Sequence, residues 1–362
     1  MRIFLDVRLA LTNTGTGRVT YNLFKEVLLQ DKKNDYTILY DKKDPFPEIK
    51  CKKIRIRDKD SRLSYLWQLF ILPKILNKHR AEVFLSIENM VCPLTFNGKL
   101  IISIQDLIPL VIKDYYNRLN DKIRYKIQIA TFLIKSKNSE VITVSEFSKG
   151  EIIKYLHVPK DKIHVIENAY TKDDIKINTV QILKNLNINF PYILAIGGAE
   201  KRKNNKTLIQ AYKMLDIKEH LVVVGNVKRG KEASQFDNLP EGEKIHFVGK
   251  VSNEEMLSLY KRASLFVYIS CYEGFGLPVL EAFSQNIPTI VSNTTSIPEV
   301  AGKGAILVDP FNQKQIATSI EKLLTDKEAR DKIIKLAKEQ LKKYSWRKSA
   351  LKLIDLFNNL NI

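Results

Sequence analysis

Residues 272–288 read YEGFGLPVLEAFSQNIP, a loop with two glycines that leads directly into a helix started by proline. Gly274 and Gly276 let the backbone turn tightly and let another molecule approach it closely. Pro278 suits the first helical position, because its missing N–H group would have no partner there. Asn286, two residues before a second proline, reads as a stop signal. The stretch therefore predicts a tight loop and a short helix.

The residues on either side of this stretch predict two buried strands. SLFVYIS (264–270) precedes it and TIVS (289–292) lies after it, and both are short apolar runs. The loop is then expected at the carboxyl end of a strand, where it opens a helix. Free N–H groups at a helix N-terminus attract anions. We therefore predict that this loop holds a phosphate group.

Length and composition indicate a soluble globular protein of two domains. The chain has 362 residues, 44% of them hydrophobic and 27% charged. The longest apolar runs, such as LWQLFILP (66–73), are too short for a membrane span, and residues 1–10 read as a strand rather than a signal peptide. Three scattered cysteines without a CxxC motif indicate reduced thiols. We therefore expect a cytoplasmic protein, and the dispersed histidines predict no metal site.

The net charge of +19 is spread along the chain. Residues 1–170 contain 30 Lys and Arg against 19 Asp and Glu, and residues 171–362 contain 29 against 21, excesses of +11 and +8. Nucleic-acid binding is disfavoured, because no nucleic-acid motif accompanies the charge. Two interpretations remain open: attraction to anionic lipid and anionic substrates, or a lysine-rich composition without function. The first allows peripheral attachment to the inner face of the cell membrane.

Short apolar runs alternate with helical patterns in two successive series, which predicts an α/β protein with parallel sheets. The first series runs from RIFLDV to KIHVIENAY (162–170), and the second from YILAIG to AILVDP. We place the domain boundary near residue 170 and expect ligands at the carboxyl ends of strands. The segment KIRYKIQIATFLIKSK (122–137) is amphipathic and basic. We expect a crossover helix with a solvated face there, with attachment to a membrane surface as the alternative.

Two further loops suit phosphate binding. TGTGR (14–18) precedes a helix expected from Arg18 to about Gln30, but a GxG motif alone is also common in plain tight turns. IGGAEKRKNNKTL (196–208) leaves a strand at Gly197 and places basic residues before a helix, an arrangement that suits a diphosphate. The alternative is a solvated basic loop.

Several motifs together resemble glycosyltransferase family 4, the retaining enzymes that use nucleotide sugars. The glutamate–seven residues–glutamate motif of YEGFGLPVLEAFSQNIP carries the resemblance, and GTGRVTYNL, SIQDLIPL (103–110), IGGAEKRKN and SNTTSIPEVAGKGAILVDP (292–310) follow the family's order. The resemblance covers nearly the whole chain and implies a GT-B fold, two Rossmann-like domains facing each other across a cleft. It implies an acceptor domain over 1–170, a donor domain over 171–345, and a C-terminal helix (about 346–362) that crosses back to the first domain.

The resemblance also implies roles for individual residues. Glu281 would accept hydrogen bonds from the donor's ribose, Glu273 would bind a hydroxyl of the donor sugar, and Lys203 would bind the diphosphate. The implied catalytic residues are Lys203, Arg202 and Glu273. The implied donor-binding residues are Gly15, Thr16, Gly17, Gly197, Gly198, Gly274, Phe275, Gly276, Leu277 and Glu281, and Gln105 and Asp106 are the implied acceptor or sugar residues.

Two positions depart from the family's pattern. Many members have an arginine where this chain has Gly198, and Arg202 is a nearby substitute for its charge. Many relatives have a histidine where this chain has Gln105. A glutamine can hydrogen-bond a sugar hydroxyl but cannot act as a cation or a base. These departures keep open a non-catalytic partner subunit as an alternative.

We expect transfer of a hexose to a glycan or a lipid-linked acceptor with retention of anomeric configuration. Fixed positive charge would stabilise the departing diphosphate, so no cofactor and no metal are expected. The pattern is most like bacterial mannosyltransferases of surface polysaccharide synthesis, which favours GDP-mannose as donor. UDP-glucose and UDP-N-acetylhexosamine remain alternatives. A glycosidase is disfavoured, because three loops suit phosphate binding. A metal-dependent transferase that uses Asp58 and Asp60 is also disfavoured, because both aspartates lie in the charge run KKIRIRDKDSR.

Overall fold

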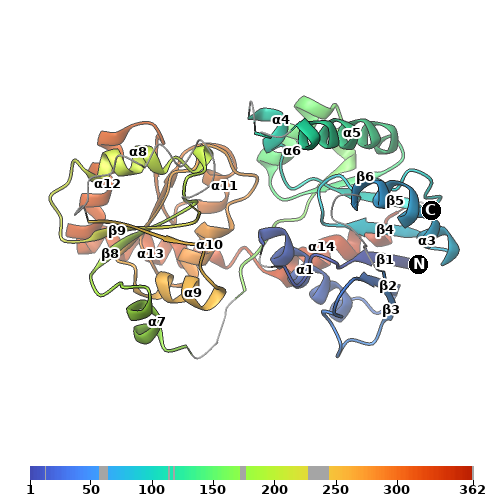
Figure 1. Ribbon diagram of the computed structural model, residues 1–362, viewed down its shortest axis with the longest axis horizontal. Helices are drawn as coiled ribbons and strands as arrows, with labels where there is room; N and C mark the ends of the chain where they lie inside the picture. Colours follow the sequence, from blue (N-terminus) through green and yellow to red (C-terminus); the bar gives the residue numbers. More distant parts are fainter. Residues whose placement is uncertain are drawn as a thin grey trace. The chain divides into compact units, whose positions relative to one another are not determined.

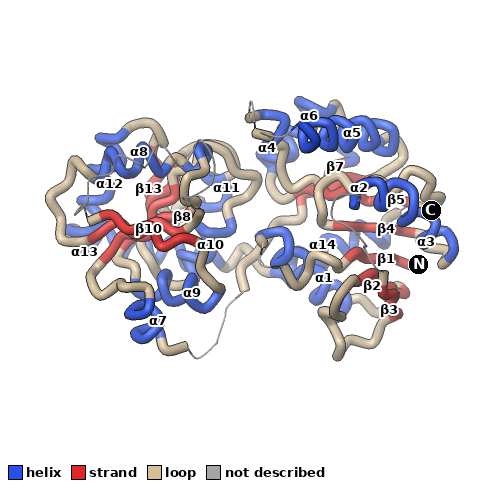
Figure 2. The backbone as a smooth tube through the Cα atoms, in the orientation of Figure 1, coloured by secondary structure: helices blue, strands red, loops and turns tan. Residues whose placement is uncertain are grey.

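A computed structural model describes residues 1–12, 14–56, 64–112, 115–116, 119–171, 177–226 and 244–360. The chain divides into two compact units (Figure 1). Unit 1 comprises Met1–Thr171 and Tyr344–Ile362, and unit 2 comprises Lys172–Lys343. Each unit has a parallel sheet with helices packed around it, so the predicted α/β class is confirmed (Figure 2).

The sheet of unit 1 has seven parallel strands among the described residues, in the order β3-β2-β1-β4-β5-β6-β7. Their bounds are β1 (Arg2–Asp6), β2 (Asp35–Tyr40), β3 (Lys52–Arg55), β4 (Val83–Ser86), β5 (Lys99–Ser103), β6 (Glu140–Thr143) and β7 (Ile163–Val165). The inner strand β1 pairs with β2 and β4, and Ile3 is in register with Tyr36 on one side and Val83 on the other. Burial on both faces explains the nearly continuous apolar runs of these strands.

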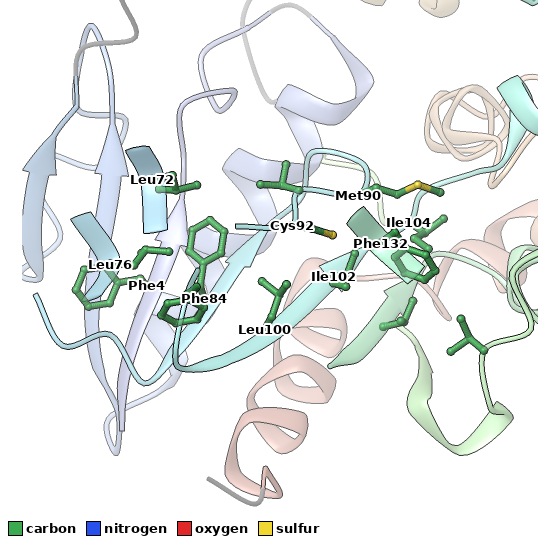
Figure 3. Close-up of a cluster of buried hydrophobic side chains, with 14 of the residues drawn as sticks. Phe4, Leu72, Leu76, Phe84, Met90, Cys92, Leu100, Ile102, Ile104 and Phe132 are labelled. Carbon is green, nitrogen blue, oxygen red and sulfur yellow. The ribbon is translucent and has the colours of Figure 1, made fainter. Parts of the chain in front are cut away.

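Helices cover the sheet of unit 1. They are α1 (Gly15–Gln30), α2 (Ser64–Leu66), the π-helical turn η1 (Trp67–Ile71), α3 (Leu72–Lys78), α4 (Ile108–Val111), α5 (Leu119–Ser136), α6 (Glu146–Leu156), the 3₁₀ turn η2 (Lys160–Lys162) and the C-terminal α14 (Trp346–Asn358). One core cluster joins the sheet to α3 and α5, with Phe4, Phe84 and Phe132 fully or almost fully buried (Figure 3).

The C-terminal helix α14 packs on α1 in unit 1, although unit 2 separates it from the rest of that unit in sequence. Its apolar face buries Ala350, Leu353 and Phe357. At its start, Trp346 Nε1 donates a hydrogen bond to Thr171 Oγ1 at 3.2 Å. The C-terminal residues therefore complete the core of unit 1.

The sheet of unit 2 has six parallel strands among the described residues, in the order β10-β9-β8-β11-β12-β13. The strands are β8 (Tyr192–Ile196), β9 (His220–Val224), β10 (Ile245–Gly249), β11 (Leu265–Tyr268), β12 (Thr289–Ser292) and β13 (Ile306–Val308). The helices are α7 (Thr179–Asn185), the 3₁₀ turn η3 (Lys201–Lys203), α8 (Asn205–Tyr212), α9 (Asn253–Arg262), α10 (Leu277–Ser284), α11 (Ile297–Ala301), α12 (Gln313–Thr325) and α13 (Lys327–Leu341).

Several local predictions need correction. The charge run KKIRIRDKDSR begins with a strand that was not predicted, because residues 52–55 form the edge strand β3 and pair with β2. Helix α1 begins at Gly15 and not at Arg18, because Thr14 caps it by accepting a hydrogen bond from Gly17 N. Pro278 is the second residue of α10 rather than the first. Asp58 and Asp60 lie outside the described residues.

Candidate functional site

The loops that follow β8, β9, β11 and β12 meet at the carboxyl edge of the sheet of unit 2. Gly197 and Gly198 follow β8, and both donate backbone hydrogen bonds to Val224 O at the end of β9. Ser270 and Glu273 follow β11. In parallel α/β sheets this edge is where ligands bind.

Gly198 occupies a position that only glycine fits. Its φ is +53°, and a Cβ atom there would lie 2.6 Å from Asn226 O and 2.7 Å from the carbonyl carbon of Gly225. An arginine at this position would collide with the backbone at the end of β9. The departure of Gly198 from the family's pattern therefore follows from close backbone packing in this chain.

Glu273 is the centre of a buried polar cluster, and a single oxygen, Oε1, receives four donors. Arg202 Nη1 and Lys203 Nζ each lie 2.6 Å from it. The hydroxyls of Tyr268 and Ser270 each lie 2.7 Å from it. No described residue donates a hydrogen bond to the other oxygen, Oε2, and the side chain keeps 11% of its surface exposed. Oε2 is therefore the oxygen of Glu273 that remains open to a ligand.

Two cations keep this buried carboxyl ionised. Burial by itself raises the pKa of Glu273, but Lys203 and then Arg202 outweigh burial and lower the pKa to about 2. For Lys203, burial lowers the pKa below its ordinary value, and Glu273 opposes that shift in part. The cluster thus holds two positive groups and one negative group in a protected position.

The fold positions Lys203 through a second glycine. Lys203 ends the 3₁₀ turn η3, and its side chain passes over Gly197, where a Cβ atom would lie 2.1 Å from Lys203 Cγ. The ammonium group also lies 4.9 Å from the ring centroid of Tyr268, a favourable cation–π distance. Gly197 is therefore needed to let Lys203 reach the cluster.

The loop of residues 273–276 is held by Ser296, the residue that precedes α11. Ser296 Oγ lies 2.8 Å from Glu273 O and 2.9 Å from Phe275 O. Gly276 has φ +110° and precedes the first residue of α10. Gly276 and Leu277 thus stand at the N-terminus of α10, next to Gly274 and Phe275.

Glu281 lies in α10, the helix that this loop opens. It is the fifth residue of α10, outside the first turn. The Tyr260 hydroxyl, from α9, donates a hydrogen bond to Glu281 Oε2 at 2.9 Å. Glu281 is half-buried, so Tyr260 orients a carboxylate that solvent still reaches.

The predicted residues of the first loop lie in unit 1, at the start of α1. A Cβ atom at Gly17 would lie 2.3 Å from Thr12 Oγ1 and 2.7 Å from Leu9 O, so Gly17 is required for packing within the unit. Gly15 has no atom within 4 Å of such a Cβ position. Of the two glycines, it is therefore Gly15 that has open space beside it.

Gln105 and Asp106 follow β5 at the carboxyl edge of the sheet of unit 1. Gln105 Nε2 donates to Ser103 Oγ at 2.7 Å, and the backbone N–H of Gln105 donates to Asn89 Oδ1 at 2.6 Å. Asp106 Oδ1 accepts a hydrogen bond from Ile108 N, the first residue of α4, at 3.1 Å. Asp106 thus has a structural task in addition to any contact with a ligand.

At the same edge lies a polar cluster that the sequence did not reveal. Arg8 holds the buried Asp6 with two side-chain hydrogen bonds of 2.8 and 2.9 Å, and its guanidinium lies 4.7 Å from the centroid of Trp67. Glu88 follows β4 and accepts a hydrogen bond from Gln68 at 2.7 Å. Burial and the Asp6 carboxylate raise the pKa of Glu88, while Arg8 opposes that shift.

The positions of Asp6 and Glu88 at the ends of two strands could have predicted this cluster from the sequence. Asp6 is the last residue of β1, and Glu88 lies two residues beyond the end of β4. Polar residues directly after adjacent parallel strands meet at one edge of the sheet. Among the described residues, no group of three or more His, Cys, Asp or Glu side chains is arranged to hold a metal ion.

Comparison with known proteins gives the family of unit 2. Residues 181–340, which include all of the Glu273 cluster and Glu281, match the family model described as Glycosyl transferases group 1. The chain therefore contains a glycosyl transferases group 1 domain, and the resemblance inferred from the motifs is confirmed.

The curated relatives include enzymes of O-antigen synthesis. The chain is 31% identical over 252 residues to O-antigen chain mannosyltransferase B of Escherichia coli, an alignment covering 66% of this chain and 65% of the relative. It is 29% identical over 261 residues to O-antigen chain mannosyltransferase RfbU of Salmonella typhimurium, covering 72% and 70%. It also matches the serotype-specific mannosyltransferase WbdA of E. coli, but over only 33% of that longer protein.

Solved structures with the same fold cover the whole chain. Sucrose-phosphate synthase from Thermosynechococcus elongatus superimposes with a TM-score of 0.74 at 17% identity, covering 99% of this chain and 98% of the other. WaaG, a glycosyltransferase involved in lipopolysaccharide biosynthesis, gives 0.72 at 15% identity, covering 99% and 100%. At these identities the matches show the fold, and the predicted GT-B class is confirmed.

Proposed function

We propose that this protein is a retaining glycosyltransferase that moves a hexose from a nucleotide sugar to a glycan or lipid-linked acceptor. The observation that carries the proposal is the buried cluster of Lys203, Arg202 and Glu273 at the carboxyl edge of the sheet of unit 2. Glu281 lies on the helix that the adjoining loop opens. All four residues fall inside the glycosyl transferases group 1 domain.

Each group of the cluster has a task in the proposed reaction. Negative charge grows on the diphosphate as the glycosidic bond breaks, and Lys203 and Arg202 supply fixed positive charge for it. The open oxygen of Glu273, Oε2, accepts a hydrogen bond from a hydroxyl of the donor sugar. Because Oε1 is held by four donors, that acceptor stays in place without rearrangement.

Glu281 is assigned to the ribose of the donor. A carboxylate is an acceptor-only group that suits two adjacent hydroxyls, and the Tyr260 hydroxyl fixes its orientation from α9. In unit 1, we assign the acceptor to the edge where Gln105, Asp106 and Glu88 lie. Glu88 lies close to the cation Arg8 and the buried Asp6, so this edge is polar and suits sugar hydroxyls.

We propose mannose as the sugar and GDP-mannose as the donor, in cell-surface polysaccharide synthesis on the cytoplasmic side of the membrane. The support is that the E. coli and Salmonella relatives at about 30% identity are named mannosyltransferases. A UDP-sugar donor is the alternative, since one structure of the same fold, HepE from Anabaena, is in complex with UDP-glucose.

The experiment is a transfer assay with a panel of labelled nucleotide sugars and a lipid-linked glycan acceptor. We expect transfer from GDP-mannose and release of GDP, with unchanged activity in excess chelator and a product of the same anomeric configuration by NMR. Transfer from a UDP-sugar but not from GDP-mannose would show that the donor is a UDP-sugar. Loss of activity with chelator and recovery with magnesium or manganese would reject a metal-independent reaction.

A further inference from the structure

Helix α5 in unit 1 presents apolar side chains to solvent where a crossover helix normally presents polar ones. Leu119 is 71% exposed, Ile123 47%, Ile127 39% and Ile134 66%. The spacing of four, four and seven residues aligns these side chains in one stripe along the helix. The predicted crossover helix with a solvated face is present, since α5 connects the parallel strands β5 and β6, but that face carries an apolar stripe.

The face of α5 that points into unit 1 is partly polar. Phe132 is fully buried in the core, but Gln128 and Thr131 are buried beside it. Thr131 Oγ1 lies 2.9 Å from the Tyr65 hydroxyl. The apolar residues on the outer face are thus not needed for the core, and a soluble surface gains nothing from them.

A second exposed apolar group lies on the segment that Tyr65 connects to α5. Leu66, Phe70 and Ile71, in and beside the turn η1, are 50%, 49% and 44% exposed. Among the described residues of unit 2, four large hydrophobic side chains are exposed: Val180, Met214, Leu307 and Phe311. With Leu133, the region of α5 and η1 carries eight of the eighteen exposed large hydrophobic side chains of the described residues.

Basic residues border the stripe on α5. Lys122, Arg124 and Lys126 are exposed beside Ile123 and Ile127, and Asp121 is the sole acidic residue of the helix. Residues 1–170 as a whole carry an excess of eleven positive charges. An exposed apolar stripe with basic residues beside it is the pattern of helices that lie in the interface of an anionic bilayer.

We propose that α5 is a membrane-docking helix, which places Leu119, Ile123, Ile127 and Ile134 among the headgroups and acyl chains of an anionic bilayer. The flanking lysines and arginine then contact lipid phosphates. No described helix is both long enough and apolar enough to span a membrane, so this contact is a surface one. The inference names the membrane partner of the proposed transferase, but its test does not require catalytic activity.

The test is flotation of the full chain with vesicles of phosphatidylcholine alone or with phosphatidylglycerol added. We expect binding to the anionic vesicles that weakens with salt, and a loss of at least about tenfold in the double variant Ile123→Ser/Ile134→Ser. The matched control is Val180→Ser/Phe311→Ser, which removes two apolar side chains from unit 2 that are at least as exposed and should bind as the wild type does. Lys122→Gln/Lys126→Gln should reduce binding to anionic vesicles most at low salt.

Three results would overturn the proposal. The first is equal binding to neutral and anionic vesicles, and the second is unchanged binding of the Ile123→Ser/Ile134→Ser variant. The third is a wild-type dimer in light scattering that this variant converts to a monomer, because the stripe would then be an interface between two copies. Circular dichroism and nucleotide-sugar binding by calorimetry check that each variant is folded. Failure of nucleotide-sugar binding in the wild type would count against the proposed function and not against membrane docking.

Discussion

Arg202 and Lys203 both hold Glu273, and its substitution should therefore affect stability as well as activity. Glu273→Gln removes the negative charge and leaves Lys203 buried without its ion-pair partner. Loss of one partner of a buried pair costs about 3–5 kcal/mol in the free energy of unfolding. We expect a clearly lower melting temperature for Glu273→Gln, and little change for Glu321→Gln on the exposed side of α12.

The same pair predicts a pH dependence. The pKa of Glu273 lies at about 2, below its ordinary value of 4.5. Its ionised form therefore stabilises the folded state fully above pH 4.5, and this contribution is lost as the pH falls from 4.5 towards 2. The difference in unfolding free energy between wild type and Glu273→Gln should shrink over that range. A constant difference in denaturant titrations from pH 7 to pH 3 would show that Glu273 is not ionised in the cluster.

At the scale of elements, the start of α1 depends on a glycine that packs against the preceding loop. Gly17→Ala puts a methyl group 2.3 Å from Thr12 Oγ1 and 2.4 Å from Thr12 O, and relief of such overpacking typically costs about 1–3 kcal/mol. Gly15→Ala is the matched control, because nothing lies within 4 Å of the added group. Thermal unfolding should show a lower melting temperature for Gly17→Ala alone. Equal melting temperatures would show that the loop of residues 9–12 can move to accommodate the added methyl group without loss of stability.

The strands of both sheets could be predicted because most are short apolar runs buried on both faces. The edge strand β3 could not, since KKIR has one apolar residue and its pairing uses backbone groups that no side-chain pattern reports. The crossover role of α5 and its solvated face could be predicted, but the apolar stripe on that face could not. The stripe has the helical period expected of a core-facing side, and only the position of Phe132 in the core shows which side faces inward.

The candidate site was predictable to a different degree in the two units. Glu273 and Lys203 are 70 residues apart in the sequence. Both were predicted as site residues from the family resemblance and not from their spacing. Their ion pair at 2.6 Å appears only in three dimensions. In unit 1, Asp6 and Glu88 come together because β1 and β4 are neighbours in the sheet. Strand order depends on tertiary packing, so no local pattern in the sequence reports it.

At the scale of the whole molecule, the C-terminal helix α14 should be essential to unit 1. Phe357 is fully buried, whereas Leu351 on the opposite side of the helix is 49% exposed. Phe357→Ala should lower the free energy of unfolding by about 3–5 kcal/mol, and Leu351→Ala should change it by less than about 0.5 kcal/mol. Denaturant unfolding of the full chain measures both. Similar small effects would mean that α14 contributes little to the core of unit 1.

The central claim is that the Lys203–Glu273 cluster and Glu281 form the binding site of a nucleotide sugar. Calorimetric titration of GDP-mannose, GDP and free mannose into the wild type and into Glu281→Gln tests it most directly. We predict one site per chain for GDP-mannose and GDP and none detectable for mannose. We also predict that GDP affinity falls by about 1–3 kcal/mol in Glu281→Gln, as for a disrupted hydrogen bond to a charged group. If neither GDP nor any other nucleoside diphosphate binds, or if Glu281→Gln binds it as tightly as the wild type, the claim is contradicted.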